Sequence, residues 1–97
     1  MIIWDEKKNE KLQKERGVSF EEVAKIIRSE RHLAIIDHPT REEQRLCIVL
    51  LNGYVHAVPF MYDDKQNIIL KTIFPCRKYH KTYGHQQHKT RPGGTMD

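Results

Sequence analysis

The sequence predicts an α+β fold. A short N-terminal strand and two helices come first, followed by a small antiparallel meander and a short C-terminal helical turn. Up to Arg31, many charged side chains accompany apolar ones at helical spacing. Beyond Arg31, short apolar runs rich in Val, Ile, Tyr and Phe are typical of strands. Between two of these runs lies Asn52-Gly53, the pair that a two-residue β-hairpin prefers.

The N-terminal segment predicts a strand followed by a surface helix. Residues 1–4 are apolar and are expected to pair with or cover the sheet, and Asp5 is the expected N-cap of a helix that ends near Arg16. Leu12 is the one aliphatic residue of this helix, so only a narrow stripe of it can be buried. Gly17 supplies a left-handed residue that ends the helix.

The second helix has the clearest start signal in the chain. Ser19 is the expected N-cap, and Glu22 completes a capping box with it. Val18 and Val23 occupy the positions of a hydrophobic staple. The apolar face that should join the core consists of Phe20, Val23, Ile26 and Ile27.

Apolar runs in the second half of the chain predict four further strands. The runs are 33–36, 46–51, 54–60 and 68–74. Asn52-Gly53 joins the second run to the third, and a turn at 63–67 joins the third to the fourth. The last three strands should therefore form an antiparallel meander.

Composition predicts one small domain with a basic surface. With 97 residues, 38% of them hydrophobic, the chain has room for a single domain over 1–83, and the polar segment 84–97 is expected to be a flexible tail. The formal charge of +4 favours a polyanionic partner. Two cysteines, no leader and no apolar run near the roughly 20 residues of a membrane-spanning helix predict a cytoplasmic protein without a membrane segment.

The segment 73–83 combines the groups that could bind a phosphate and move a proton. Metal-free RNA cleavage requires a base for the 2′-hydroxyl, a stabiliser of phosphate charge and an acid for the leaving oxygen. Arg77 suits the phosphate because its guanidinium can bind two oxygens. If 76–83 forms a helical turn, Arg77 shares a face with His80, the candidate acid, and with Lys81.

Other residues are weaker candidates, each with a structural alternative. Glu43 and Arg45 could act as base and charge stabiliser from one side of a strand, or form an exposed ion pair. His56 could present its imidazole on a sheet face, or be a half-buried structural histidine. The candidate substrate-binding residues are Lys71, Lys78, Lys81, Tyr79 and Tyr83. The alternatives for these are a solvated basic face and tyrosines that pack on the sheet.

The sequence predicts no metal site and no cofactor. Cys76, His80, His85 and His88 are residue types that bind zinc. Their spacing lacks a Cys-x-x-Cys pair, and His85 and His88 fall in the expected tail.

Four segments in order resemble motifs of the BrnT family of bacterial toxins, whose fold is related to that of the RelE ribonucleases. The segments are Trp4-Asp5-Glu6-Lys7-Lys8-Asn9, Gly17-Val18-Ser19-Phe20-Glu21-Glu22-Val23, Glu43-Gln44-Arg45-Leu46 and Ile73-Phe74-Pro75-Cys76-Arg77. Tyr83 also stands about where that family often closes with a Tyr. The chain departs from the family at Arg16, where a His is frequent, and at Pro75-Cys76, which replaces a Ser-Ala pair.

The resemblance implies a RelE-like fold and a toxin of a type II toxin-antitoxin system. It implies an RNA endonuclease, or mRNA interferase, that inhibits translation. The implied partners are an RNA substrate and a cognate antitoxin, in a heterotetramer or another toxin-antitoxin assembly. The alternative function is a non-catalytic RNA- or protein-binding module of the same fold.

Overall fold

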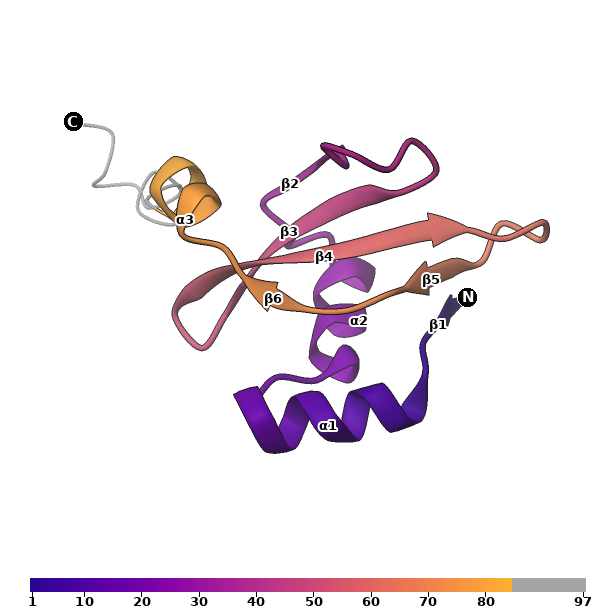
Figure 1. Cartoon of the computed structure of the whole chain (residues 1–97), viewed down its shortest axis with the longest axis horizontal. Coiled ribbons are helices and arrows are strands. Elements are labelled where there is room, and N and C mark those ends of the chain that lie inside the picture. Colours follow the sequence, from indigo (N-terminus) through magenta and orange to yellow (C-terminus); the bar gives the residue numbers. More distant parts are fainter. Residues whose placement is uncertain (85–97) are drawn as a thin grey trace.

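The computed structural model describes residues 1–84 of the 97-residue chain. The predicted tail lies outside the described residues except for Gly84. The element order confirms the α+β class, with a strand, two helices, further strands and a last short helix (Figure 1). The elements are β1 (Ile2–Ile3), α1 (Glu6–Arg16), α2 (Phe20–Arg28), β2 (Ala34–Asp37), β3 (Arg45–Leu51), β4 (Tyr54–Tyr62), β5 (Ile68–Leu70), β6 (Phe74–Pro75) and α3 (Arg77–Tyr83).

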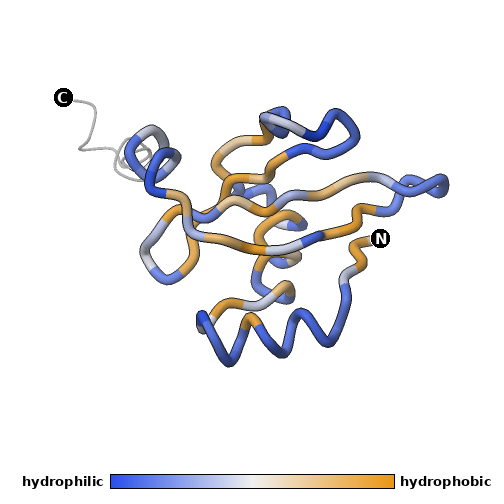
Figure 2. Tube along the Cα trace, viewed as in Figure 1, coloured by the Kyte–Doolittle hydropathy of each residue, from blue (hydrophilic) through white to orange (hydrophobic). Residues whose placement is uncertain are grey.

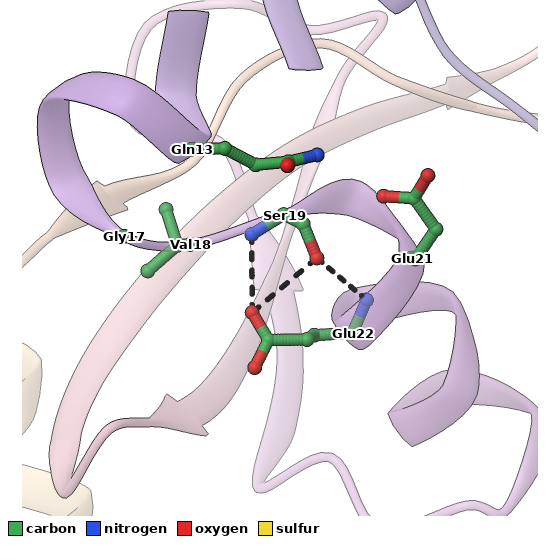
Figure 3. Close-up of a pocket in the computed structure, with 6 residues that line it drawn as sticks. All are labelled: Gln13, Gly17, Val18, Ser19, Glu21 and Glu22. Atoms are coloured by element: carbon green, nitrogen blue, oxygen red, sulfur yellow. Dashed lines mark hydrogen bonds between the residues drawn. The ribbon is translucent and has the colours of Figure 1, made fainter. Parts of the chain in front are cut away.

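The helix boundaries agree with the capping residues. The Asp5 side chain accepts a hydrogen bond from the Lys7 N–H at the start of α1, and Gly17 ends the helix at φ 68°. Both bonds of the capping box are present in α2, as Figure 3 shows. The Glu22 N–H donates to Ser19 Oγ at 3.2 Å, and the Ser19 N–H donates to Glu22 Oε1 at 3.1 Å. These bonds satisfy N–H groups that a free helix end would leave without partners.

The strands form one sheet with the order β1-β5-β4-β3-β2, and β6 also pairs with β4. Strands β3, β4 and β5 pair antiparallel, so the predicted meander is confirmed. At the β3–β4 hairpin, Asn52 has φ 53° and Gly53 has φ 78°, the positive values that a type I′ turn requires. The N-terminal strand β1 pairs with β5, and this pairing is parallel.

Each face of the sheet has its own apolar cluster. Helices α1 and α2 cover one face, and α3 lies at one end of the opposite face (Figure 1). The tube in Figure 2 is hydrophobic along the central strands and hydrophilic along most of α1 and α3. The cluster beneath α1 and α2 contains Leu12, Val18, Phe20, Val23, Cys47, Val49, Leu51, Val58, Phe60, Leu70 and Ile73. The cluster beneath α3 is built on Leu46, Ile48, Val55 and Ala57.

One buried polar side chain, Asn9, joins the two N-terminal helices. It is fully buried, and its Oδ1 accepts a hydrogen bond of 2.7 Å from the Phe20 N–H. Its Nδ2 donates to Glu6 and to Glu21, at 3.0 and 2.7 Å. The side chain therefore meets most of its hydrogen-bonding capacity while it fixes the start of α2 against α1. Sequence reasoning did not single out this residue.

The prediction of one continuous strand over 68–74 is wrong, because a β-bulge divides it into β5 and β6. Phe60 pairs with Leu70, whereas Ala57 pairs with Phe74. Three residue steps along β4 are thus matched by four along the last strand, which is the signature of one extra residue. The extra residue lies between Leu70 and Phe74.

Pro59 and Arg16 explain why the ladder breaks at this point. The Lys71 N–H donates to Pro59 O, so the backbone of Pro59 faces the last strand. Proline has no N–H to donate back, and a strand beside such a position tolerates a bulge. The Ile73 carbonyl instead accepts a hydrogen bond of 2.8 Å from Arg16 Nη1. The α1 side chain thereby holds the bulged segment that leads into β6 and α3.

Candidate functional site

Helix α3 forms where the sequence predicted a helical turn, and the edge of β4 positions it. The Cys76 N–H, directly after β6, donates to Val55 O at 3.1 Å. The N–H of the same Val55 donates to Nδ1 of His80 at 3.2 Å. If β6 continued, a backbone carbonyl of that strand would accept the Val55 N–H, and the imidazole of His80 takes the place of that carbonyl. His80 therefore anchors α3 to the sheet edge.

The aromatic ring of Tyr54 brings His80 and His56 together. The rings of His80 and Tyr54 are stacked, with 4.1 Å between centroids and 7° between planes. His56 meets the same tyrosine edge to face, at 6.2 Å. Both candidate histidines therefore belong to one cluster, the ring cluster of Tyr54, His56 and His80. Sequence reasoning missed Tyr54, although its position two residues before His56 on a strand places both on one face.

Backbone hydrogen bonds assign different tautomers to the two neutral imidazoles. His56 Nδ1 lies 2.9 Å from Tyr54 O, so it carries the hydrogen and leaves a lone pair on Nε2. His80 Nδ1 accepts from an N–H, so its hydrogen is on Nε2. Within residues 1–84, His32 Nδ1 is the one fully buried side-chain polar atom without a partner. His56 as a whole is only 7% exposed, whereas His80 is partly exposed.

The exposed side of α3 is basic. Arg77, Lys78 and Lys81 are exposed, and Lys78 Nζ lies 5.6 Å from the centre of the Tyr79 ring. Arg77 makes no ion pair within the described residues, so its guanidinium is available to an anion. Tyr79 and Tyr83 pack against the apolar cluster beneath α3. This packing is the structural alternative that the sequence left open for the two tyrosines.

The structure does not bring Glu43 and Arg45 to this cluster. Glu43 lies in the turn before β3, and Arg45 forms its ion pair with Asp37 on β2, at 3.6 Å. Because β3 begins at Arg45, the prediction that Glu43 and Arg45 lie on one strand is wrong. The register places Arg45 four residue pairs from His56, about 13 Å along the strands.

Lys71 is exposed at the start of the bulge, between β5 and β6. No group of three or more His, Cys, Asp or Glu side chains that could hold a metal ion occurs within residues 1–84. His85 and His88, weighed as zinc ligands, lie outside the described residues.

A hollow of about 470 Å³ at the α1–α2 turn is lined by Gln13, Gly17, Val18, Ser19, Glu21 and Glu22 (Figure 3). Its two carboxylates make it unsuitable for RNA.

Comparison with known proteins identifies the family. A family model described as the ribonuclease toxin BrnT of type II toxin-antitoxin systems matches residues 4–82. The chain belongs to the BrnT family. Searches of curated proteins and of solved structures found no match. The BrnT match extends from Trp4 to the last turn of α3, so it includes the ring cluster and the basic helix face.

Membership of the BrnT family establishes the general function. The family consists of ribonuclease toxins of type II toxin-antitoxin systems, which implies an RNA substrate and an antitoxin partner. None of the helices in the described part of this BrnT chain has the length and apolar character needed to cross a membrane.

Proposed function

We propose that this BrnT-family protein is an endoribonuclease, an mRNA interferase that cleaves RNA without a metal ion and thereby inhibits translation. Its active site consists of the ring cluster and the start of α3. The observation that supports this site best is the bond from the Val55 N–H to His80 Nδ1. This bond fixes the imidazole so that Nε2–H is directed away from the backbone, three residues after the exposed Arg77.

The hydrogen bonds of the two imidazoles suggest separate roles. His56 Nε2 takes the proton of the 2′-hydroxyl, whose oxygen attacks phosphorus to form a 2′,3′-cyclic phosphate. The bond from phosphorus to the 5′-oxygen breaks, that oxygen takes a proton from a solvent water, and His56 returns its own proton to solvent. Arg77 and the His80 Nε2–H donate to the phosphate oxygens as their charge develops. The role of His80 thus changes from the predicted acid to a hydrogen-bond donor, since protonation at Nδ1 would break its bond to Val55.

Lysines next to this centre hold the flanking phosphates. Lys78 and Lys81 lie on the exposed side of α3, and Lys71 lies at the bulge before β6. Lysine supplies a mobile point charge, which suits backbone phosphates that need no fixed geometry. The uncovered parts of the Tyr79 and Tyr83 rings are available for contact with bases. Glu43 and Arg45 take no part in this centre.

Replacement of Arg77 tests the proposal. In a chelator, wild-type protein should cleave single-stranded RNA to products with cyclic phosphate ends. Arg77→Ala should lower the rate by about 10²- to 10³-fold, because a donor to the developing charge is lost. Arg77→Lys should recover part of the rate, and Arg28→Ala on α2 should not change it. A wild-type rate for Arg77→Ala would refute the assignment, and cleavage only with added divalent metal would refute metal independence.

One observation favours the alternative of a non-catalytic binding module. Nδ1 of both histidines is bonded to backbone, as in histidines that serve structure alone. The same RNA assay distinguishes the two functions. Wild-type protein that binds RNA but leaves it intact at every concentration would establish the binding module.

A further inference from the structure

A second basic site lies where α1 meets the β-bulge. A hollow of about 180 Å³ opens there, and its lining residues are Lys8, Lys11, Leu12, Glu15, Arg16 and Thr72. We call it the α1 hollow. Its volume is below the roughly 300 Å³ at which pockets for drug-sized ligands begin, so it suits a small group.

The charges around the α1 hollow favour an anion. Three cations line it against the single carboxylate of Glu15. The one ion pair within residues 1–84 joins Arg45 to Asp37, so none of these three cations is neutralised by a described carboxylate. The Arg16 guanidinium is fixed by its bond to Ile73 O, which leaves its other N–H groups free to donate. Thr72 adds a hydroxyl from the bulge.

We propose that the α1 hollow binds a phosphodiester of the RNA backbone, at a subsite separate from the cleavage site at α3. The inference rests on the proposed ribonuclease function. A phosphate matches the size and charge of the hollow, and no aromatic ring lines it to stack on a base. The five residue steps from Thr72 to Arg77 span at most about 17 Å, so one single strand can reach both sites.

The bulge gives this subsite its geometry. Thr72 lies in the segment that holds the extra residue of the bulge, and it lines the hollow beside α1. Arg16 donates to the carbonyl of Ile73, the next residue. Figure 1 shows α1 on one side of the sheet and α3 on the other, with the bulge and β6 along the edge between them. RNA bound at both sites therefore crosses this edge, past Lys71.

Helix α1 provides a matched pair of variants. Lys8 and Lys11 line the hollow, whereas Lys7 and Lys14 are exposed on the same helix and do not line it. The double variants Lys8→Gln/Lys11→Gln and Lys7→Gln/Lys14→Gln remove the same charge from surface positions. The probe is a 12-nucleotide RNA with 2′-O-methyl groups throughout, which binds but cannot be cleaved through its 2′-oxygens. Thermal unfolding verifies that both variants remain folded.

The measurement is the slope of log affinity against log salt concentration. Loss of the one phosphate contact in the hollow should lower the magnitude of the slope by about 0.7, because each phosphate contact of a single strand contributes about that much. Lys8→Gln/Lys11→Gln should show this loss, and Lys7→Gln/Lys14→Gln should show little change. Equal slopes for the two double variants would overturn the subsite.

Binding of a polyglutamate peptide in place of RNA tests whether the hollow binds an acidic protein instead. If Lys8→Gln/Lys11→Gln weakens peptide binding but leaves RNA binding unchanged, the hollow belongs to an acidic protein and the RNA subsite is overturned. The probe measures binding alone, so the subsite and the ribonuclease function can fail separately. If the wild-type protein cleaves no RNA but the two double variants differ in slope, the subsite stands and the proposed ribonuclease activity is refuted.

Discussion

At the scale of single residues, the two ends of the His80 ring have different tasks. Nδ1 completes the hydrogen bonding of Val55, and Nε2–H is left for a ligand. His56 shows the same division, with Nδ1 bonded to Tyr54 O. Sequence reasoning could name both histidines, because His80 lies on a basic segment and His56 lies within an apolar strand. It could not assign the tautomer of His80, which depends on the distant backbone N–H of Val55.

Cys47 is a residue whose burial predicts a dependence of stability on pH. Burial raises the pKa of its thiol from 9.0 to about 11. Between these values the unfolded chain loses the proton while the folded chain keeps it, so stability falls as pH rises. The loss approaches about 1.4 kcal/mol per pH unit.

Urea unfolding of wild type and Cys47→Ala from pH 8 to 10.5 measures this effect. The variant lacks the thiol, so its stability relative to wild type should improve as pH rises. Cys76→Ala serves as a control for the second thiol, which is only partly buried. Parallel curves for wild type and Cys47→Ala would show that the Cys47 thiol does not contribute.

At the scale of elements, capping residues were predictable and long-range bonds were not. The boundaries of α1 and α2 follow from Asp5, Gly17 and Ser19, because caps act within a few residues. The bulge depends on Pro59 opposite the last strand, and apolar content alone could not reveal it. The sequence signal was the proline itself, within a strand that has neighbours on both sides.

The connection between α1 and α2 depends on Asn9. Asn9→Ala would leave the Phe20 N–H without its acceptor in a fully buried position. An unsatisfied buried group costs about 1–3 kcal/mol, so we expect a loss of stability of about 2 kcal/mol in urea unfolding. Gln13→Ala, at an exposed position of the same helix, should change stability little. Equal stabilities for the two variants would contradict the role of Asn9.

At the scale of the whole molecule, two groups of basic side chains lie near one edge of the sheet. The chain has 17 basic and 13 acidic residues, a modest excess. The α1 hollow, Lys71 and the exposed side of α3 lie near the edge formed by the bulge and β6, whereas Glu21 and Glu22 lie at the α1–α2 turn. Net charge predicted a polyanionic partner, but its distribution requires the fold. Lys8 and Lys11 were not candidates from the sequence, because only the fold shows that they line a hollow.

Cleavage of RNA by the ring cluster and the start of α3 is tested most directly by His80→Asn. Asparagine can still accept the Val55 N–H through its side-chain oxygen, so α3 should remain in place, but it lacks the Nε2–H. The measurement is the single-turnover rate of RNA cleavage in chelator by the folded variant. The expected rate is about 10²-fold below that of wild type, because one donor to the developing charge is lost. A rate equal to that of wild type would contradict it.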